Sequence, residues 1–195
     1  MKKFLFITAT LLAITGISQA QVAVAPAPEN NQQSTASVKQ PINGKKHKKE
    51  PRQLDRSEVS SMAKNNFMAD FPGASNAAWT HGKYFDEVSF LQKGIALTAY
   101  YDYMSMLVGS TSVKTVNDLP AGAQKQLQKQ WLAKGYTVDK VILFDDNEAN
   151  ETNMVLYNNA FDDQDNYFIE LHNGKRAIIL QSDMEGLLGF FKEVK

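Results

Sequence analysis

Cysteine is missing from all 195 residues of the chain. The protein can therefore form no disulfide, no thiolate metal site and no cysteine nucleophile. Histidine is scarce: His47, His81 and His172 are the only three, and no two have a spacing typical of zinc ligands. The G-x-S-x-G motif of serine hydrolases does not occur, and a hydrolase built on Ser182 and His172 is kept only as a hypothesis to test. We expect no catalytic residue, no metal and no cofactor.

Long apolar runs are also missing, with one exception at the N-terminus. Two lysines precede the apolar run 4–17, and Ser18-Gln19-Ala20 places small residues at the minus-three and minus-one positions of a signal-peptidase cleavage site. The run is too short for a transmembrane helix. We therefore predict a signal peptide over residues 1–20, cleaved after Ala20. The mature protein is expected to be periplasmic or secreted, with no membrane span.

Aromatic residues are missing from residues 21–53, which are rich in Pro, Ala, Asn, Gln and Ser. Such a segment cannot bury enough surface to offset the cost of ordering it, and we predict a disordered basic linker. It carries six Lys or Arg against two Glu, whereas residues 54–195 carry thirteen against nineteen Asp or Glu. The lysine-rich run 44–49 is interpreted as a solvated tether, with an anionic surface as an alternative partner. The acidic balance of the remainder argues against nucleic acid.

A helix is predicted at the start of the acidic part of the chain. It is expected to begin at Asp55, where Glu58 completes a capping box, and to end before Pro72. Apolar residues recur at helical spacing in between. Gly73 then allows the chain to reverse. Trp79 is expected to cover the joint between this helix and the following strand.

Short segments of alternating polarity follow, and they predict an antiparallel meander. A second helix is expected to open at Asp118-Leu119-Pro120, with Ala123, Leu127 and Trp131 as its apolar stripe and Gly135 as its stop. A second set of strands comes after it. The expected strands cover residues 77–80, 83–91, 95–102 and 107–113 in the first set, and 137–144, 153–159, 166–172 and 176–181 in the second.

The order of one helix and four strands thus occurs twice, which predicts a tandem repeat. The predicted register superposes Gly73 on Gly135 early in the unit and Leu97 on Tyr167 further along. The second spacing is the longer one, and the difference is assigned to an insertion at residues 145–151. The predicted fold class is α+β, with the helices packed on one face of a single antiparallel sheet. The two units are expected to cover about 54–116 and 117–195 of one domain that spans 54–195.

Several short motifs lie between residues 57 and 190: FPGA at 71–74, Trp79, Tyr84 with Val88 and Phe90, AYYD at 99–102, DLP at 118–120, GY at 135–136 and LHNGK at 171–175. In order and spacing they resemble the PepSY-like family, described as β-lactamase-inhibitor-like and common in exported proteins of Bacteroidetes-type bacteria. The resemblance implies tandem α/β units, no catalytic residues, and an exposed sheet face that in the inhibitors grips an enzyme. The chain departs from the family at Tyr103-Met104-Ser105, where a glycine is usual, and it lacks a second FPGA motif and the inhibitors' disulfides.

The strand parity predicts which side chains lie on the sheet face opposite the helices. Tyr100 points to that face if its neighbours face the helices, and the repeat register adds Phe168, Glu170 and His172. Aromatic and polar side chains mixed in this way are typical of protein-binding surfaces. We predict that these four residues bind an unidentified protein or peptide. The alternative is that the rings only pack across strands.

Two acidic clusters, residues 145–151 and 162–166, suggest another function. Calcium takes about six to eight oxygen ligands, and alternating Asp and Asn residues supply several. The EF-hand pattern fails in both clusters, so solvated loops are the preferred interpretation. The predicted function is an exported, non-enzymatic binding module, protein-binding or inhibitor-like. The alternative is a small-ligand or cation-binding sensor of the cell envelope.

Overall fold

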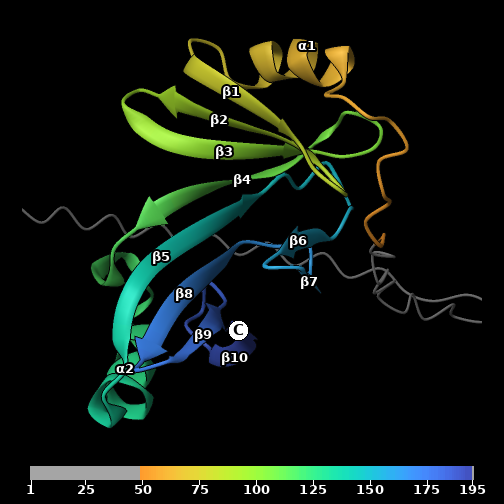
Figure 1. The fold of residues 1–195 in the computed structure, drawn as a ribbon. Coiled ribbons are helices and arrows are strands. Elements are labelled where there is room, and N and C mark those ends of the chain that lie inside the picture. The colour runs from red at the N-terminus through yellow and green to blue at the C-terminus, as the bar shows by residue number, and fades with distance from the viewer. Residues whose placement is uncertain (1–48, 195) are drawn as a thin grey trace, which may run out of the picture. The chain divides into compact units, whose positions relative to one another are not determined.

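The computed structural model describes residues 49–194, and the predicted signal peptide and most of the predicted linker lie outside the described residues. Eight strands form one antiparallel sheet in the order β1-β2-β3-β4-β5-β8-β9-β10, and two more form a separate hairpin (Figure 1). The elements are α1 (Ser61–Asp70), β1 (Ser75–His81), β2 (Asp86–Gln92), β3 (Ile95–Tyr101), β4 (Leu107–Lys114), η1 (Val116–Asp118), α2 (Ala121–Gln130), η2 (Leu132–Lys134), β5 (Thr137–Asp146), β6 (Met154–Leu156), β7 (Asn159–Phe161), β8 (Asn166–Asn173), β9 (Arg176–Ser182) and β10 (Leu188–Val194).

Both helices lie on one face of the curved sheet, and the β6–β7 hairpin lies on the other (Figure 1). Phe67 of α1 is buried with Val88 and Phe90, whereas Leu127 of α2 is buried in a second cluster with Ile169. Side chains of opposite parity form a third cluster with the hairpin; its buried members are Phe85, Tyr100, Val108, Phe144, Met154, Phe161, Phe168 and Ile179. The α+β fold with helices on one face is therefore confirmed.

The first helix starts later than its sequence predicts. Its N-cap is Ser60, not Asp55, and the Ser60 hydroxyl accepts hydrogen bonds from the backbone N–H groups of Met62 and Ala63, at 3.1 and 3.4 Å. The reason is tertiary: the Ser60 N–H donates to the buried carboxylate of Asp86, at 2.9 Å. A contact with the sheet therefore overrides the local capping box.

The end of this helix and the role of Trp79 agree with the sequence prediction. The helix ends at Phe71, before the proline, and Gly73 takes a φ of +80° that favours glycine. The indole of Trp79 meets the ring of Phe67 edge-on, with 5.6 Å between centroids. In the second unit α2 begins one residue after Pro120, and Asp118 instead closes the short 3-10 turn before it.

The second set of strands differs from the prediction in two places. The segment predicted as one strand over 153–159 forms the separate hairpin, not a member of the sheet. The edge strand β10 was not predicted, because its apolar residues run together around Gly189 without strict alternation. Each unit still contributes four strands to the sheet: β1 to β4, then β5, β8, β9 and β10.

Strand pairing corrects the register of the repeat. Trp79 pairs with Val88 in the first unit, and Val141 pairs with Ile169 in the second. Trp79 therefore corresponds to Val141, as the predicted superposition of Gly73 on Gly135 requires. The next strand departs from the prediction, because β2 corresponds to β8 and β3 to β9. The insertion in the second unit is thus longer than the predicted segment 145–151, and it contains the hairpin.

Matching contacts between helix and loop confirm the duplication. The side-chain amide of Asn66 in α1 donates to the carbonyl oxygen of Ser105, at 2.8 Å. The side-chain amide of Gln126 in α2 donates to the carbonyl oxygen of Gly186, also at 2.8 Å. Ser105 has a φ of +64° and Gly186 a φ of +91°, so serine occupies the left-handed position that glycine fills in the second unit.

Candidate binding surface

The β6–β7 hairpin covers only part of the sheet face opposite the helices. The uncovered part contains a shallow groove of about 360 Å³, which we call the open groove. Because successive side chains alternate between faces, each strand contributes every second residue to it. The side chains of this face that line the groove are Ala78, Ser89, Leu91, Ala96, Thr98, Thr111, Val113, Lys140 and Ile142.

The base of the open groove is formed mainly by small side chains. The hydroxyls of Ser89 and Thr98 on adjacent strands hydrogen-bond to each other at 3.0 Å, which satisfies both groups without a partner. Val113 is 62% exposed at one margin of the groove, and Ile142 beside it is half-buried. An apolar surface with polar groups already paired can accept another protein with little desolvation cost.

Tyr100 and Phe168 lie on the predicted side of the sheet, but the expectation that they are exposed is wrong. Tyr100 is 8% exposed and its hydroxyl pairs with that of Thr111 at 3.1 Å; burial raises the pKa of Tyr100 to about 12. Phe168 is fully buried, and its ring contacts the hairpin ring of Phe161 with 4.8 Å between centroids. The inserted hairpin covers both rings, which the sequence register could not anticipate.

Glu170 and His172 lie further along β8 and do not line the open groove, although Glu170 pairs with Lys140 at its margin. A carboxylate oxygen of Glu170 accepts a hydrogen bond from the hydroxyl of Tyr157 in the hairpin turn, at 2.7 Å. Burial and the Glu170 charge raise the pKa of Tyr157. His172 Nδ1 lies 2.7 Å from Asp139 Oδ1, and both side chains are 45% exposed. The structure therefore does not gather the four predicted residues into one contact surface, and binding by them stays a prediction.

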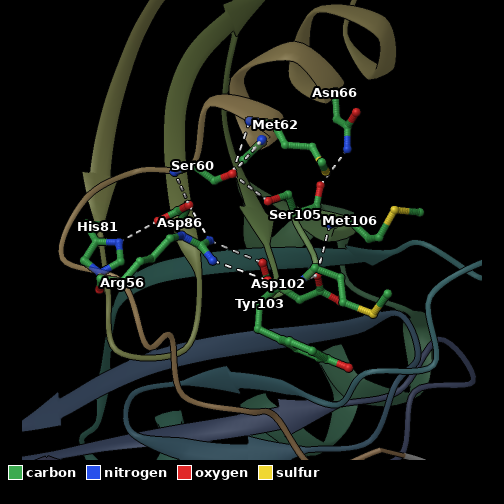
Figure 2. A network of polar contacts seen from close by, with 12 residues as sticks. Arg56, Ser60, Met62, Asn66, His81, Asp86, Asp102, Tyr103, Ser105 and Met106 are labelled. Carbon is green, nitrogen blue, oxygen red and sulfur yellow. Dashed lines mark hydrogen bonds and ion pairs between the residues drawn. The ribbon is translucent and has the colours of Figure 1, made fainter.

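A buried carboxylate joins three segments of the first unit (Figure 2). Asp86 accepts hydrogen bonds from Arg56 Nη2 at 2.6 Å and from the Ser60 N–H at 2.9 Å, and its other oxygen lies 2.7 Å from His81 Nδ1. His81 Nε2 lies 2.8 Å from the Arg56 carbonyl oxygen. Burial alone would raise the pKa of Asp86, but the hydrogen bonds from Ser60, Arg56 and His81 lower it below its usual value. This network fixes the start of α1 against β1 and β2.

The serine, histidine and acid of this network do not form a catalytic triad. The Ser60 hydroxyl accepts hydrogen bonds from two backbone N–H groups and from Ser105 Oγ, and His81 makes its contacts with Asp86 and the Arg56 backbone. Ser182, the serine of the hydrolase hypothesis, is buried, and its hydroxyl donates a hydrogen bond to the Asp183 carbonyl oxygen at 3.0 Å. Neither serine hydroxyl has a hydrogen bond to a histidine among the described residues, as a Ser–His pair would require.

The two acidic clusters converge on one groove of about 710 Å³, which we call the acidic groove. Burial first, and then contacts with Asp163 and Asp165, raise the pKa of Asp146 to about 7. Within residues 49–194 no group of three or more His, Asp or Glu has an arrangement that could hold a metal ion. The acidic residues that line the groove are Asp145, Asp146, Glu148, Glu151, Asp163, Asp165, Asp183 and Glu185.

The fold defines a class of protein: one antiparallel sheet built from two helix-plus-meander units, with one face left partly open. Its structural neighbours include a BLIP-like protein and DUF2874 family proteins, in line with the sequence resemblance. A BLIP-like protein from Bacteroides fragilis matches with a TM-score of 0.52 at 13% identity, over 72% of this chain and 88% of that one. A DUF2874 family protein from Bacteroides uniformis matches with a TM-score of 0.55 at 14% identity, over 67% of this chain and 86% of that one.

A third structural neighbour is described by its cellular location. A protein from Bacteroides eggerthii, described as a proposed periplasmic protein, matches with a TM-score of 0.55 at 12% identity, over 71% of this chain and 89% of that one. No family model matches the sequence, and no curated protein does. At these identities the likeness establishes the fold alone. Among the described residues, no helix is long and apolar enough to cross a membrane.

Sequence reasoning pointed to the sheet face opposite the helices, but none of its four predicted residues lines the open groove. The residues of the open groove are mostly small, and alanine, serine and threonine carry little signal of a binding site. One signal was available: Ser89, Thr98 and Thr111 lie on neighbouring strands at the same parity. The pairing of these three strands is needed to see that the residues are adjacent, and alternation within each single strand does not provide it.

Proposed function

We propose that the protein is an exported, non-enzymatic binding module that holds a protein partner on the open groove. The observation that carries this proposal is the division of one sheet face into a part covered by the hairpin and a part that no other segment of residues 49–194 covers. The partner would present an aliphatic or aromatic side chain to the groove floor, with polar groups around it. An inhibitor-like role is compatible with the BLIP-like fold, and the partner need not be a β-lactamase.

Export of the chain is part of this proposal. It is supported by the signal-peptide pattern of residues 1–20 and by the described location of the neighbour from Bacteroides eggerthii. A binding module of this kind would meet its protein partner outside the cytoplasm. A stable interface needs about 800 Å² on each partner, so the contact would extend from the open groove onto the surrounding strands.

The test places a photo-crosslinking amino acid at Ser89, which is exposed on the open groove, in the producing cell. The matched control places it at Gln128, which is exposed on α2 on the opposite face. We expect one discrete crosslinked product from Ser89 and none from Gln128. The additional change Ala96→Arg, which puts a long cation on the groove, should abolish that product. Equal products from both positions, or a product from Gln128 alone, would refute the proposed surface.

A further inference from the structure

The acidic groove has no cation among the described residues that line it, although eight of its ten lining residues are acidic. Like charges crowded in one hollow repel each other. The raised pKa values of Asp145 and Asp146 follow from burial first and then from their acidic neighbours, with Lys114 acting in the opposite direction on Asp145. A positively charged occupant would relieve this repulsion.

The first described residue of the chain, Lys49, contacts a residue that lines the acidic groove. The Lys49 N–H donates to the Glu151 carbonyl oxygen at 3.0 Å, and the Lys49 carbonyl oxygen accepts from the Asn153 N–H at 2.9 Å. The Lys49 ammonium lies 3.5 Å from the carboxylate of Glu151, which lines the groove. Backbone hydrogen bonds and a side-chain ion pair therefore hold Lys49 against the segment 151–153, which includes the groove residue Glu151.

The lysine-rich residues come directly before Lys49 in the sequence. Lys49 and Thr152 form a parallel bridge, which places Lys49 beside the segment that leads to Thr152. That segment contributes Glu148 and Glu151 to the groove, and the strand before it contributes Asp145 and Asp146. Residues 45–48 read Lys-Lys-His-Lys, and at about 3.5 Å per residue they reach roughly 14 Å from Lys49.

We propose that the lysine-rich segment 44–48 docks in the acidic groove of the same molecule. Three lysines of the segment would face the groove carboxylates as exchangeable ion pairs, and Lys49 with Glu151 is the anchored end of that series. The segment is thus a tethered ligand, which the short connection to Lys49 holds at high effective concentration. The acidic groove shares no lining residue with the open groove, so either proposal can fail without the other.

A zero-length carbodiimide crosslinker, which joins lysine amines to carboxylates in direct contact, tests the docking. It is applied to the protein purified after expression of the full sequence, and crosslinks in the monomer are mapped by mass spectrometry. We expect Lys45, Lys46 or Lys48 joined to groove carboxylates, with the yield falling at 1 M NaCl, where the Debye length is about 3 Å. Crosslinks to carboxylates elsewhere, or only between two chains, would overturn the proposal.

A charge-deletion pair provides the second arm. One variant carries Lys45→Ser, Lys46→Ser and Lys48→Ser; its control carries Lys125→Ser, Lys129→Ser and Lys134→Ser, three exposed lysines on and after α2. A synthetic peptide of residues 44–49 should bind the first variant about tenfold more tightly than the control, because only the control keeps its own segment in place. Equal peptide affinity for both would contradict docking. Calcium binding that is identical in both variants would likewise contradict it, since it would show the groove to be an unoccupied cation site.

Discussion

The two units of the protein follow the same plan and differ chiefly in one connection. In the first unit, four residues join β1 to β2; in the second, the chain between β5 and β8 includes the whole β6–β7 hairpin. The helix contacts, left-handed loop positions and strand order are otherwise repeated. The insertion in the second unit covers residues of both units, including Tyr100 and Phe168. Among the described residues it leaves the open groove, most of which lies on the first unit, uncovered. In a fold built from two similar units, an insertion that is present in only one of them can decide which part of the sheet face is exposed.

The largest expected effect tests the covered half against the open half. Phe168→Ala removes a fully buried ring beneath the hairpin and should lower the free energy of unfolding by about 3–5 kcal/mol. Leu91→Ala, on the same face but in the open groove, should cost less than about 1 kcal/mol. Urea unfolding of both variants measures the difference. Equal losses would mean that the two halves are packed alike.

A second prediction concerns the buried network around Asp86, which among residues 49–194 is found in the first unit only. Asp86→Asn should cost about 2–3 kcal/mol at pH 7, because charged hydrogen bonds to Ser60, Arg56 and His81 are weakened. The pKa of Asp86 is lowered on folding, so its contribution is present above the unfolded-state pKa of about 3.9 and is lost as the pH falls through the folded-state value. The difference between wild type and variant in urea unfolding should therefore shrink below about pH 4. A constant difference from pH 7 to pH 3 would contradict it.

The left-handed loop positions should respond unequally in the two units. Gly186→Ala places a Cβ 3.0 Å from the Ala123 backbone nitrogen and 3.1 Å from Pro120 Cβ, at a φ of +91°, and should cost about 1–3 kcal/mol. Ser105→Gly relieves about 1 kcal/mol of left-handed strain and loses a hydrogen bond of similar value to Ser60 Oγ, so its net effect should be small. Thermal melts of both variants decide this; a large loss for Ser105→Gly would show that the serine is required.

The smallest effect tests the equivalence of the helix–loop contacts. Asn66→Ala and Gln126→Ala each remove one amide that donates to a loop carbonyl oxygen at 2.8 Å. Each should cost about 0.5–1.5 kcal/mol, and the two losses should agree within error. Paired urea titrations provide the measurement. Losses that differ by more than the whole expected value would argue against the equivalence.

Local signals in the sequence predicted the elements better than their assembly. The Phe71-Pro72-Gly73 stop, the Trp79 contact and the left-handed Gly135 follow from the chemistry of single residues and are found in the structure. The Asp55 cap was wrong because a distant carboxylate, Asp86, accepts a hydrogen bond from the backbone of Ser60, and the helix begins there, five residues later. Local propensity cannot account for a partner on a different strand of the sheet.

The candidate surface was only half predictable for a related reason. Alternation correctly set Tyr100 and Phe168 on the face opposite the helices, because period two is a property of any strand. Whether that face is exposed depends on the long insertion between β5 and β8, whose hairpin folds back over it. Superposing Leu97 on Tyr167 also keeps the apolar alternation, so the sequence pattern did not reveal the error. Strand alternation sets the face on which a side chain lies, but packing by a segment distant in sequence determines whether that side chain is exposed.

Hydrogen–deuterium exchange on the complex captured through Ser89, compared with the free protein, tests the central claim most directly. The account predicts slower exchange in β2, β3 and β4 of the first unit, with no change in α2 or in the β6–β7 hairpin. Slower exchange confined to the helices or to the hairpin would contradict it, because the partner would then rest on a surface that the insertion does not define.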